Sequence, residues 1–189
     1  MNAEGGLERR TRDELVPSEF DFEQHVSTLS LGLQSSARSA DVLLLPATFG
    51  DEHPGGFPEL TPDVFGYLRE HLPEGVTVEA AVDEEDYAEY SFWSSIEIIL
   101  PVLLVADLTT IDVVTSLLVA YVKNLLTRER LKDGHVRSNI HVVVSPDGSI
   151  ALNHAYEGPA DTFERAMADL SRHIENRQGT TENREDPCA

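Results

Sequence analysis

The segment from Ile96 to Val122 is nearly continuous aliphatic sequence in a chain whose formal net charge is −20. Such a segment crosses a membrane, lies on one, or forms the core of a globular domain. In the window from Ile98 to Ser116, eleven Val, Ile and Leu residues favour insertion by roughly 3 to 6 kcal/mol, whereas Asp107 and Asp112 oppose it by about 5 to 7 kcal/mol. Pro101 also interrupts helical hydrogen bonding. The balance disfavours a membrane span and indicates core helices.

The composition indicates one soluble domain with an acidic surface. A length of 189 residues with 41 % hydrophobic residues suits one domain. The 34 acidic residues against 14 basic ones oppose binding to nucleic acid and to anionic lipid, because the long-range field repels both. A carboxylate-rich surface is typical of a salt-rich archaeal cytoplasm, and the preference for Arg over Lys is equally typical of a GC-rich bacterium. We keep both origins.

The cysteine content and the N-terminal sequence bear on the compartment. Cys188 is the single cysteine, so an internal disulfide is excluded. The N-terminal residues contain no apolar run of the kind that a secretory signal has. We therefore expect a cytoplasmic protein.

The chain divides into three regions by its polarity. Residues 1–38 predict a partly disordered N-terminal arm, residues 39–175 a single α/β domain, and residues 176–189 a disordered acidic tail. Five apolar residues of the arm can form a short helix or a segment that packs on the body, namely Phe20, Phe22, Val26, Leu29 and Leu31.

The first part of the domain reads as a strand–helix–strand unit. The aliphatic run after Asp41 predicts a strand buried on both faces, and a loop rich in Gly and Pro follows over residues 49–60. A helix begins at Thr61–Asp63, where a hydroxyl cap, a proline and a carboxylate follow one another. The alternating residues 76–82 predict a second strand. The two strands should be parallel with a right-handed crossover.

The aliphatic region itself reads as two helices. Ser94 and Glu97 have the spacing of a capping box and predict a first helix, with a strand at Ile98–Val105 as the alternative. Asp107, or one of the threonines after it, caps a second helix that ends near Thr127. The apolar stripe of this second helix comprises Ile111, Val114, Leu118, Val122 and Leu125.

The last part of the domain sequence predicts a hairpin and a closing helix. Residues 140–145 and 150–155 read as antiparallel strands joined by a turn at Pro146–Gly148. Asp161 caps a helix whose apolar face comprises Phe163, Ala166, Met167, Leu170 and Ile174. The fold class predicted from this order is α/β with α+β character: a small mixed sheet of about four strands in a two-layer sandwich.

The strongest candidate for an active site is the run Asp51, Glu52 and His53. It follows the carboxyl end of a predicted buried strand, where open α/β sheets bind ligands. A carboxylate beside an imidazole can perform acid–base chemistry or hold a metal ion. A solvated turn is the favoured alternative, because these residue types are common in turns.

His141 and His154 are weak candidates for metal ligands, since the hairpin can place them across adjacent strands. Polar residues on an exposed sheet face are the commoner explanation of such a pair. The acidic run 83–86, with Glu79 and Glu89 nearby, lacks the glycine and the spacing of a calcium loop, so a solvated surface is favoured. The chain contains no GxSxG, dinucleotide or phosphate-loop motif, and we predict no cofactor.

Five of the basic residues lie close together in sequence. They can meet an acidic partner, lipid head groups or nucleic acid, but cations at a helix end also complement the helix dipole, and this second explanation is favoured. The five residues are Lys123, Arg128, Arg130, Lys132 and Arg137.

Residues 41–175 carry a resemblance to a known family. The run DVVTSLLVAYVKNLL, the basic RERLK, the strand–turn–strand sequence NIHVVVSPDGSIAL and a final helix resemble the effector-associated constant component modules of prokaryotic conflict systems. Glycine-rich segments precede the aliphatic helix in that family, whereas this chain has IEIILPVLLVADLTT there. The resemblance implies a non-catalytic adaptor or sensor module and assigns no catalytic residues.

Three functional hypotheses follow from the sequence. The leading one is a non-enzymatic interaction module of a defence or signalling system, in which the stripe Ile111–Leu125 binds a protein partner or a second copy in a homodimer. The second is a small hydrolase or metal-dependent enzyme with its site at Asp51–His53. The third is a peripheral membrane protein that binds through the aliphatic region and the basic segment.

Overall fold

The computed structural model describes residues 11–18, 20–49, 53–82, 87–90, 97–129, 134–144 and 150–182. Its elements in chain order are β1 (Arg12–Pro17), α1 (Phe22–Ser27), α2 (Leu31–Ser39), β2 (Val42–Leu44), β3 (Ala47–Phe49), β4 (His53–Pro58), α3 (Thr61–His71), β5 (Val78–Ala80), β6 (Glu89–Tyr90), β7 (Glu97–Leu104), α4 (Leu108–Arg128), β8 (His135–Val142), β9 (Leu152–Pro159) and α5 (Ala160–Glu182).

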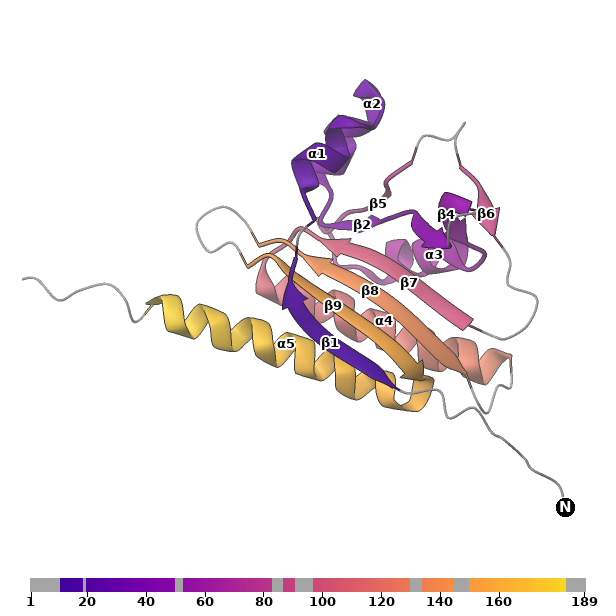
Figure 1. Ribbon diagram of the computed structural model, residues 1–189, viewed down its shortest axis with the longest axis vertical. Helices are drawn as coiled ribbons and strands as arrows, with labels where there is room; N and C mark the ends of the chain where they lie inside the picture. Colours follow the sequence, from indigo (N-terminus) through magenta and orange to yellow (C-terminus); the bar gives the residue numbers. More distant parts are fainter. Residues whose placement is uncertain are drawn as a thin grey trace, which may run out of the picture.

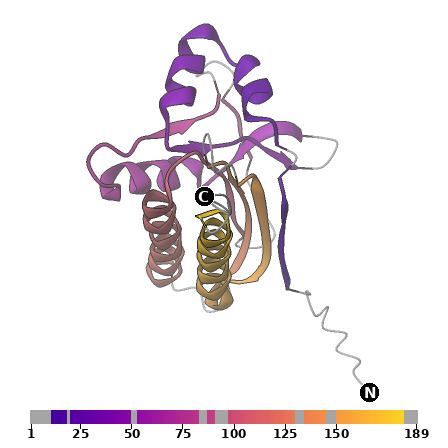
Figure 2. The ribbon, with the colours of Figure 1, turned by 90° about the vertical axis from the view of Figure 1, so that its left-hand side faces the viewer.

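A six-stranded mixed sheet forms the centre of the protein, with the strand order β1-β9-β8-β7-β2-β5. The pairs β7·β8 and β2·β5 are parallel, and the other neighbours are antiparallel. Helices α4 and α5 lie side by side against one face of this sheet (Figures 1 and 2). A small second sheet comprises β3, β4 and β6. The predicted mixed α/β fold is confirmed, and the main sheet has six strands where the sequence predicted about four.

The first half of the aliphatic region is strand β7, so the helix predicted there is wrong and the alternative reading as a strand holds. Ile98, Val102 and Leu104 face the core under α4, whereas Leu103 faces a second apolar cluster on the opposite side. A strand buried on both faces needs apolar residues at every position, which hides the alternation that normally reveals a strand. Glu97 opens β7, and Ser94 lies outside the described residues.

Pro101 lies within β7, and the surrounding backbone shows why it is tolerated. Its carbonyl accepts a hydrogen bond of 3.0 Å from the Leu45 backbone N–H. The nitrogen and the carbonyl of one strand residue point to the same side, so the missing N–H of Pro101 faces the β2 side. The ladder between β2 and β7 ends at Leu44, opposite Val102. Pro101 thus lies at the end of this ladder, where it accepts a hydrogen bond from Leu45 and cannot return one.

Helix α4 confirms the second predicted helix and its cap. The Asp107 carboxylate accepts a 2.8 Å hydrogen bond from the Thr110 backbone N–H. Of the described chain, α4 is the one helix that is long and apolar enough to cross a membrane, and 44 % of that stretch is buried inside the protein. The five residues of its predicted stripe are at most 4 % exposed: Ile111, Val114, Leu118, Val122 and Leu125.

The hairpin and the closing helix are also confirmed. β8 and β9 pair antiparallel along eight positions, and the predicted turn at Pro146–Gly148 lies outside the described residues. The predicted apolar face of α5 is at most 2 % exposed. Three details differ. The strands β8 and β9 extend farther from the turn than the predicted ranges 140–145 and 150–155. Asp161 lies inside the first turn of α5, and α5 continues through residues 176–182, where the sequence predicted a loose tail.

The predicted N-terminal arm contains β1, α1 and α2, and its residues 1–10 lie outside the described residues. β1 adds an edge strand to β9, and α1 and α2 pack on the sheet face opposite α4. The apolar contact there joins Val26 and Ala37 of the arm to Leu43 and Leu103 of the sheet. β1 has few apolar residues because it is an edge strand whose side chains, apart from Leu15, are exposed.

The strand–helix–strand prediction is correct in its pairing, since β2 and β5 are parallel. The predicted loop over residues 49–60 instead contains β4, which pairs antiparallel with β3 at the end of the predicted strand run. α3 begins as predicted at Thr61, with Pro62 in its first turn, but its N-cap is Leu60 and makes no side-chain hydrogen bond. Glycine and proline in β4 concealed this strand, because both are depleted in strands.

We predict that Leu118→Ala lowers the free energy of unfolding by about 2 to 5 kcal/mol, because truncating a fully buried leucine leaves a cavity. Urea denaturation followed by circular dichroism measures the change. The matched control is Ser116→Ala on the exposed side of the same helix, which should change the free energy by no more than about 0.5 kcal/mol. Equal effects of the two substitutions would contradict the burial of this face.

Candidate functional site

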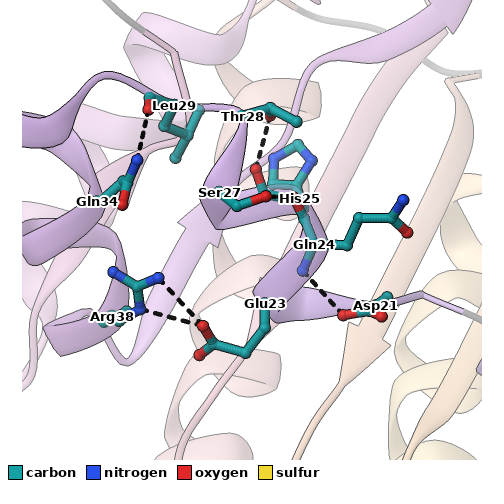
Figure 3. Close-up of polar contacts among 9 residues, drawn as sticks. All are labelled: Asp21, Glu23, Gln24, His25, Ser27, Thr28, Leu29, Gln34 and Arg38. Atoms are coloured by element: carbon teal, nitrogen blue, oxygen red, sulfur yellow. Dashed lines mark hydrogen bonds and ion pairs between the residues drawn. The ribbon is translucent and has the colours of Figure 1, made fainter.

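Helices α1 and α2 form a compact arm that is tied together by polar contacts (Figure 3). The Asp21 carboxylate caps α1 by accepting a 2.9 Å hydrogen bond from the Gln24 backbone N–H. An ion pair of 3.1 Å joins Arg38 of α2 to Glu23 of α1. Exposed ion pairs contribute little stability, so the apolar cluster beneath the two helices is what holds the arm on the sheet.

Two histidines and a phenylalanine attach the arm to the sheet. The Phe20 ring lies between the imidazoles of His25 and His141, with centroid distances of 5.3 and 4.8 Å. The Ser18 hydroxyl accepts from the Phe20 backbone N–H and is 3.1 Å from Nδ1 of His141. Burial lowers the pKa of His25 and of His141, because an apolar environment disfavours the charged imidazolium. Both imidazoles are therefore neutral near pH 7.

The arm places the start of α2 beside an apolar hollow of about 570 Å³. The hollow lies among α2, the first half of α3 and β5. We call this recess the apolar hollow. It is lined by Gly32, Leu33, Thr61, Pro62, Phe65, Glu79, Ala80, Val82 and Tyr87. The Tyr87 ring stacks on Phe57 at 5.2 Å, and its hydroxyl donates a 2.7 Å hydrogen bond to Glu89.

Leu31 lies next in sequence to this lining and is 86 % exposed. Single exposed apolar side chains are common on protein surfaces. Here, however, Leu31 and Tyr87 are two of the three large apolar side chains that are exposed in the described part of the chain. The lining holds one carboxylate, Glu79, and no histidine or basic side chain. The hollow can therefore bind apolar groups but contains no acid–base pair.

The predicted site at Asp51, Glu52 and His53 receives no support from the geometry. Asp51 and Glu52 lie outside the described residues, and His53 is the first residue of β4, opposite Phe49. The acidic run 83–86 is likewise outside them. Within the described ranges, no group of three or more His, Cys, Asp or Glu side chains is placed to hold a metal ion.

His141 and His154 lie on adjacent strands but on opposite faces, so they do not form a shared metal site. In the register of the hairpin, His141 pairs with Asn153 and His154 pairs with Ile140. Successive side chains of a strand point to opposite faces. His154 is 2 % exposed and bonds to Asp13 of β1 through Nε2, at 2.9 Å. Its role is to hold the edge strand in place.

The stripe Ile111, Val114, Leu118, Val122 and Leu125 was predicted to bind a partner, and the structure places it elsewhere. All five side chains are buried in the core between α4 and the sheet. A partner cannot reach them in this fold, so the interaction role assigned to the stripe is corrected: its partner is the protein's own sheet.

The basic residues pair with carboxylates of the same chain. Lys123 bonds to Glu164, Arg128 to Asp63, and Arg137 to Glu157. The predicted explanation by the helix dipole is thus supplemented by ion pairs between elements. Arg130 and Lys132 lie outside the described residues.

The exposure of Leu31 was not predicted from the sequence, although a signal for it exists. Ser30 caps α2, and its hydroxyl accepts from the Leu33 backbone N–H. Leu31 and Leu33 are two residues apart, which separates their directions by about 200° around a helix. Both leucines therefore cannot face the same part of the body, and one must remain outside.

Comparisons of the chain with protein-family models, with curated proteins and with solved structures find no match.

We predict that the free energy of unfolding falls between pH 7.5 and 5.5, partly through His25. Its folded pKa is lowered from the ordinary value of 6.5 by burial, so the unfolded chain binds more protons in this range and stability is lost as the pH falls through 6.5. Urea denaturation at each pH measures the slope. His25→Leu should flatten it, whereas Gln24→Leu, at the neighbouring exposed position, should leave it unchanged. An unchanged slope in His25→Leu would refute the assignment.

Proposed function

We propose that the protein is a non-enzymatic interaction module that associates through the apolar hollow, and that the occupant is Leu31 of a second copy. The observation that supports this proposal is the position of Leu31, an apolar side chain that is 86 % exposed, directly beside a cavity of matching chemistry. A projecting side chain and a recess on one surface make that surface self-complementary. This is the requirement for a two-fold symmetric, isologous interface.

The energetics are consistent with a reversible dimer. Each copy buries one leucine in the hollow of the other, and a buried leucine side chain contributes about 1.5 to 3 kcal/mol. Phe65, Leu33 and Val82 provide the apolar walls. Opposed to this is the repulsion between two chains that each carry a net charge of −20. Salt screens that repulsion, so the dimer forms at high ionic strength and dissociates at low ionic strength.

The cellular role that we propose is that of an adaptor in the cytoplasm of a prokaryote, in a defence or signalling system. The resemblance of residues 41–175 to effector-associated constant component modules motivates this part. The structure supports this part through the chemistry of the apolar hollow, whose lining holds one carboxylate and no histidine or basic side chain. An adaptor needs a recognition surface and no reactive group.

Sedimentation equilibrium tests the proposal. We predict a mass near the 20.9 kDa of one chain at about 0.1 M KCl and near twice that mass at about 2 M, because the Debye length shrinks with salt. Leu31→Asp should remain a monomer at both salts. Val16→Asp is the control, since Val16 is also exposed but lies on β1, and it should still dimerise.

Two outcomes would overturn the proposal. A monomer of the unmodified protein at every salt and protein concentration would exclude the second copy as the occupant. Flotation with liposomes that is lost in Leu31→Asp, without any dimer, would assign the same surface to a lipid bilayer instead.

A further inference from the structure

A second concave surface lies between α3 and α4 and differs in chemistry from the apolar hollow, with which it shares only Pro62. It is a groove of about 500 Å³. The α3 residues that line it recur on one face of the helix, at the spacing of successive turns. The lining defines the tyrosine groove: Pro62, Asp63, Gly66, Tyr67, Glu70, Tyr121, Asn124, Leu125 and Arg128.

Asp63 is the central polar group of the tyrosine groove. The Tyr121 hydroxyl donates to its Oδ2 at 3.2 Å, and the Arg128 guanidinium donates to the same oxygen at 3.1 Å. The other carboxylate oxygen of Asp63, Oδ1, accepts no hydrogen bond from the described part of the chain. A carboxylate has about four lone-pair sites, so Asp63 keeps an acceptor for a further donor.

Tyr67 and Tyr121 supply aromatic surface at this point. Their ring centroids are 5.4 Å apart at an interplanar angle of 56°. Burial, and after it the Asp63 charge, raises the pKa of Tyr121 well above its usual range, so its phenol stays protonated and remains a donor. Gly66 adds space, since a Cβ there would meet no atom within 4 Å.

Glu70 provides a second carboxylate on the same helix. It is exposed, and no ion pair joins it to another residue of the described chain. Seven residues separate it from Asp63, which corresponds to about 10 Å along the helix axis. Tyr67 and Gly66 lie between the two carboxylates in sequence.

The charge balance of the tyrosine groove favours a cation. Its single basic side chain, Arg128, already bonds to Asp63 and to Glu129. The net charge of −20 attracts cations over a long range and repels anions. Aromatic rings add a favourable interaction with ammonium groups that lie within about 6 Å of them.

We propose that the tyrosine groove binds a linear polyamine. One ammonium group donates to Oδ1 of Asp63, and a second reaches Glu70, two helical turns away. The methylene chain between them lies over Gly66 and against Tyr67 and Leu125. A triamine of the length of spermidine, when extended, spans the two carboxylates, whereas a four-carbon diamine reaches only one of them.

Isothermal titration calorimetry with spermidine and putrescine tests this inference, using the full chain at about 0.15 M salt to screen diffuse attraction. We expect a single spermidine site and at least about fivefold weaker binding of putrescine, since each exposed ion pair contributes up to about 1 kcal/mol. Glu70→Gln should lower the affinity for spermidine about fivefold and change the affinity for putrescine by less than about twofold.

The matched control is Glu175→Gln, which removes the same charge from an exposed position on α5 and should change spermidine affinity less than about twofold. Tyr67→Leu keeps an apolar side chain and removes the ring, so it should lower the affinity for both spermidine and putrescine. Circular dichroism checks that this variant keeps the fold.

Three results would overturn the inference. Equal effects of Glu70→Gln and Glu175→Gln would show diffuse binding of counterions to an acidic surface. Equal affinity for spermidine and putrescine would exclude a ligand that bridges the two carboxylates. Binding of Nα-acetyl-lysine amide, which keeps the ε-ammonium group, as tight as that of spermidine would show that the groove recognises a single ammonium group, such as a lysine of a partner protein.

Discussion

The burial of β7 on both faces is the constraint on which the rest of the structure depends. β7 is hydrogen-bonded to β2 on one side and to β8 on the other, so it joins the strand–helix–strand unit to the C-terminal hairpin. Its side chains also join the two apolar clusters: Val102 contributes to the core under α4, and Leu103 to the cluster under the arm. Strand β7 is thus the element that connects the two halves of the main sheet and its two apolar clusters.

The consequences differ on the two sides of the sheet. On one side, α4 and α5 cover the apolar face over its length (Figure 2). On the other side, the short helices α1 and α2 cover only the part near β2 and β7, at one end of the sheet (Figure 1). Because the arm is smaller than the sheet face on which it packs, the surface where the arm ends stays exposed to solvent. The apolar hollow and the exposed Leu31 both lie on this surface, which explains why the recognition surface is found there.

The helix α3 has a similar position between two environments. Phe65 turns toward the apolar hollow, while Tyr67 and Glu70 turn toward α4 and the tyrosine groove. Because side chains on one helix point in different directions around its axis, one short helix separates an apolar recess from a polar one. The two proposals, self-association and cation binding, therefore concern different faces of the same element and can be tested with separate variants.

Local patterns in the sequence were sufficient for α3, α4, α5 and the β8–β9 hairpin, because each buries one face only and keeps a readable period. They failed for β7, whose apolar residues serve two clusters at once, and for β4, where Gly and Pro suggested a loop. They also failed for β1, which has few apolar residues. The site at Asp51–His53 was predicted from its position after a strand. That position does not predict which side chains from other parts of the chain lie near the loop.

The sequence by itself determined the acidic surface, the amphipathic helices and the cap of α4 at Asp107, because these depend on residues within a few positions of one another. Only the tertiary structure decided that Ile111–Leu125 faces the protein's own sheet, that His141 and His154 lie on opposite faces, and that Leu31 stands beside a hollow. These facts depend on strand register and on contacts between distant segments. A shift of one residue in register reverses every side chain of a strand, and no local pattern records that choice.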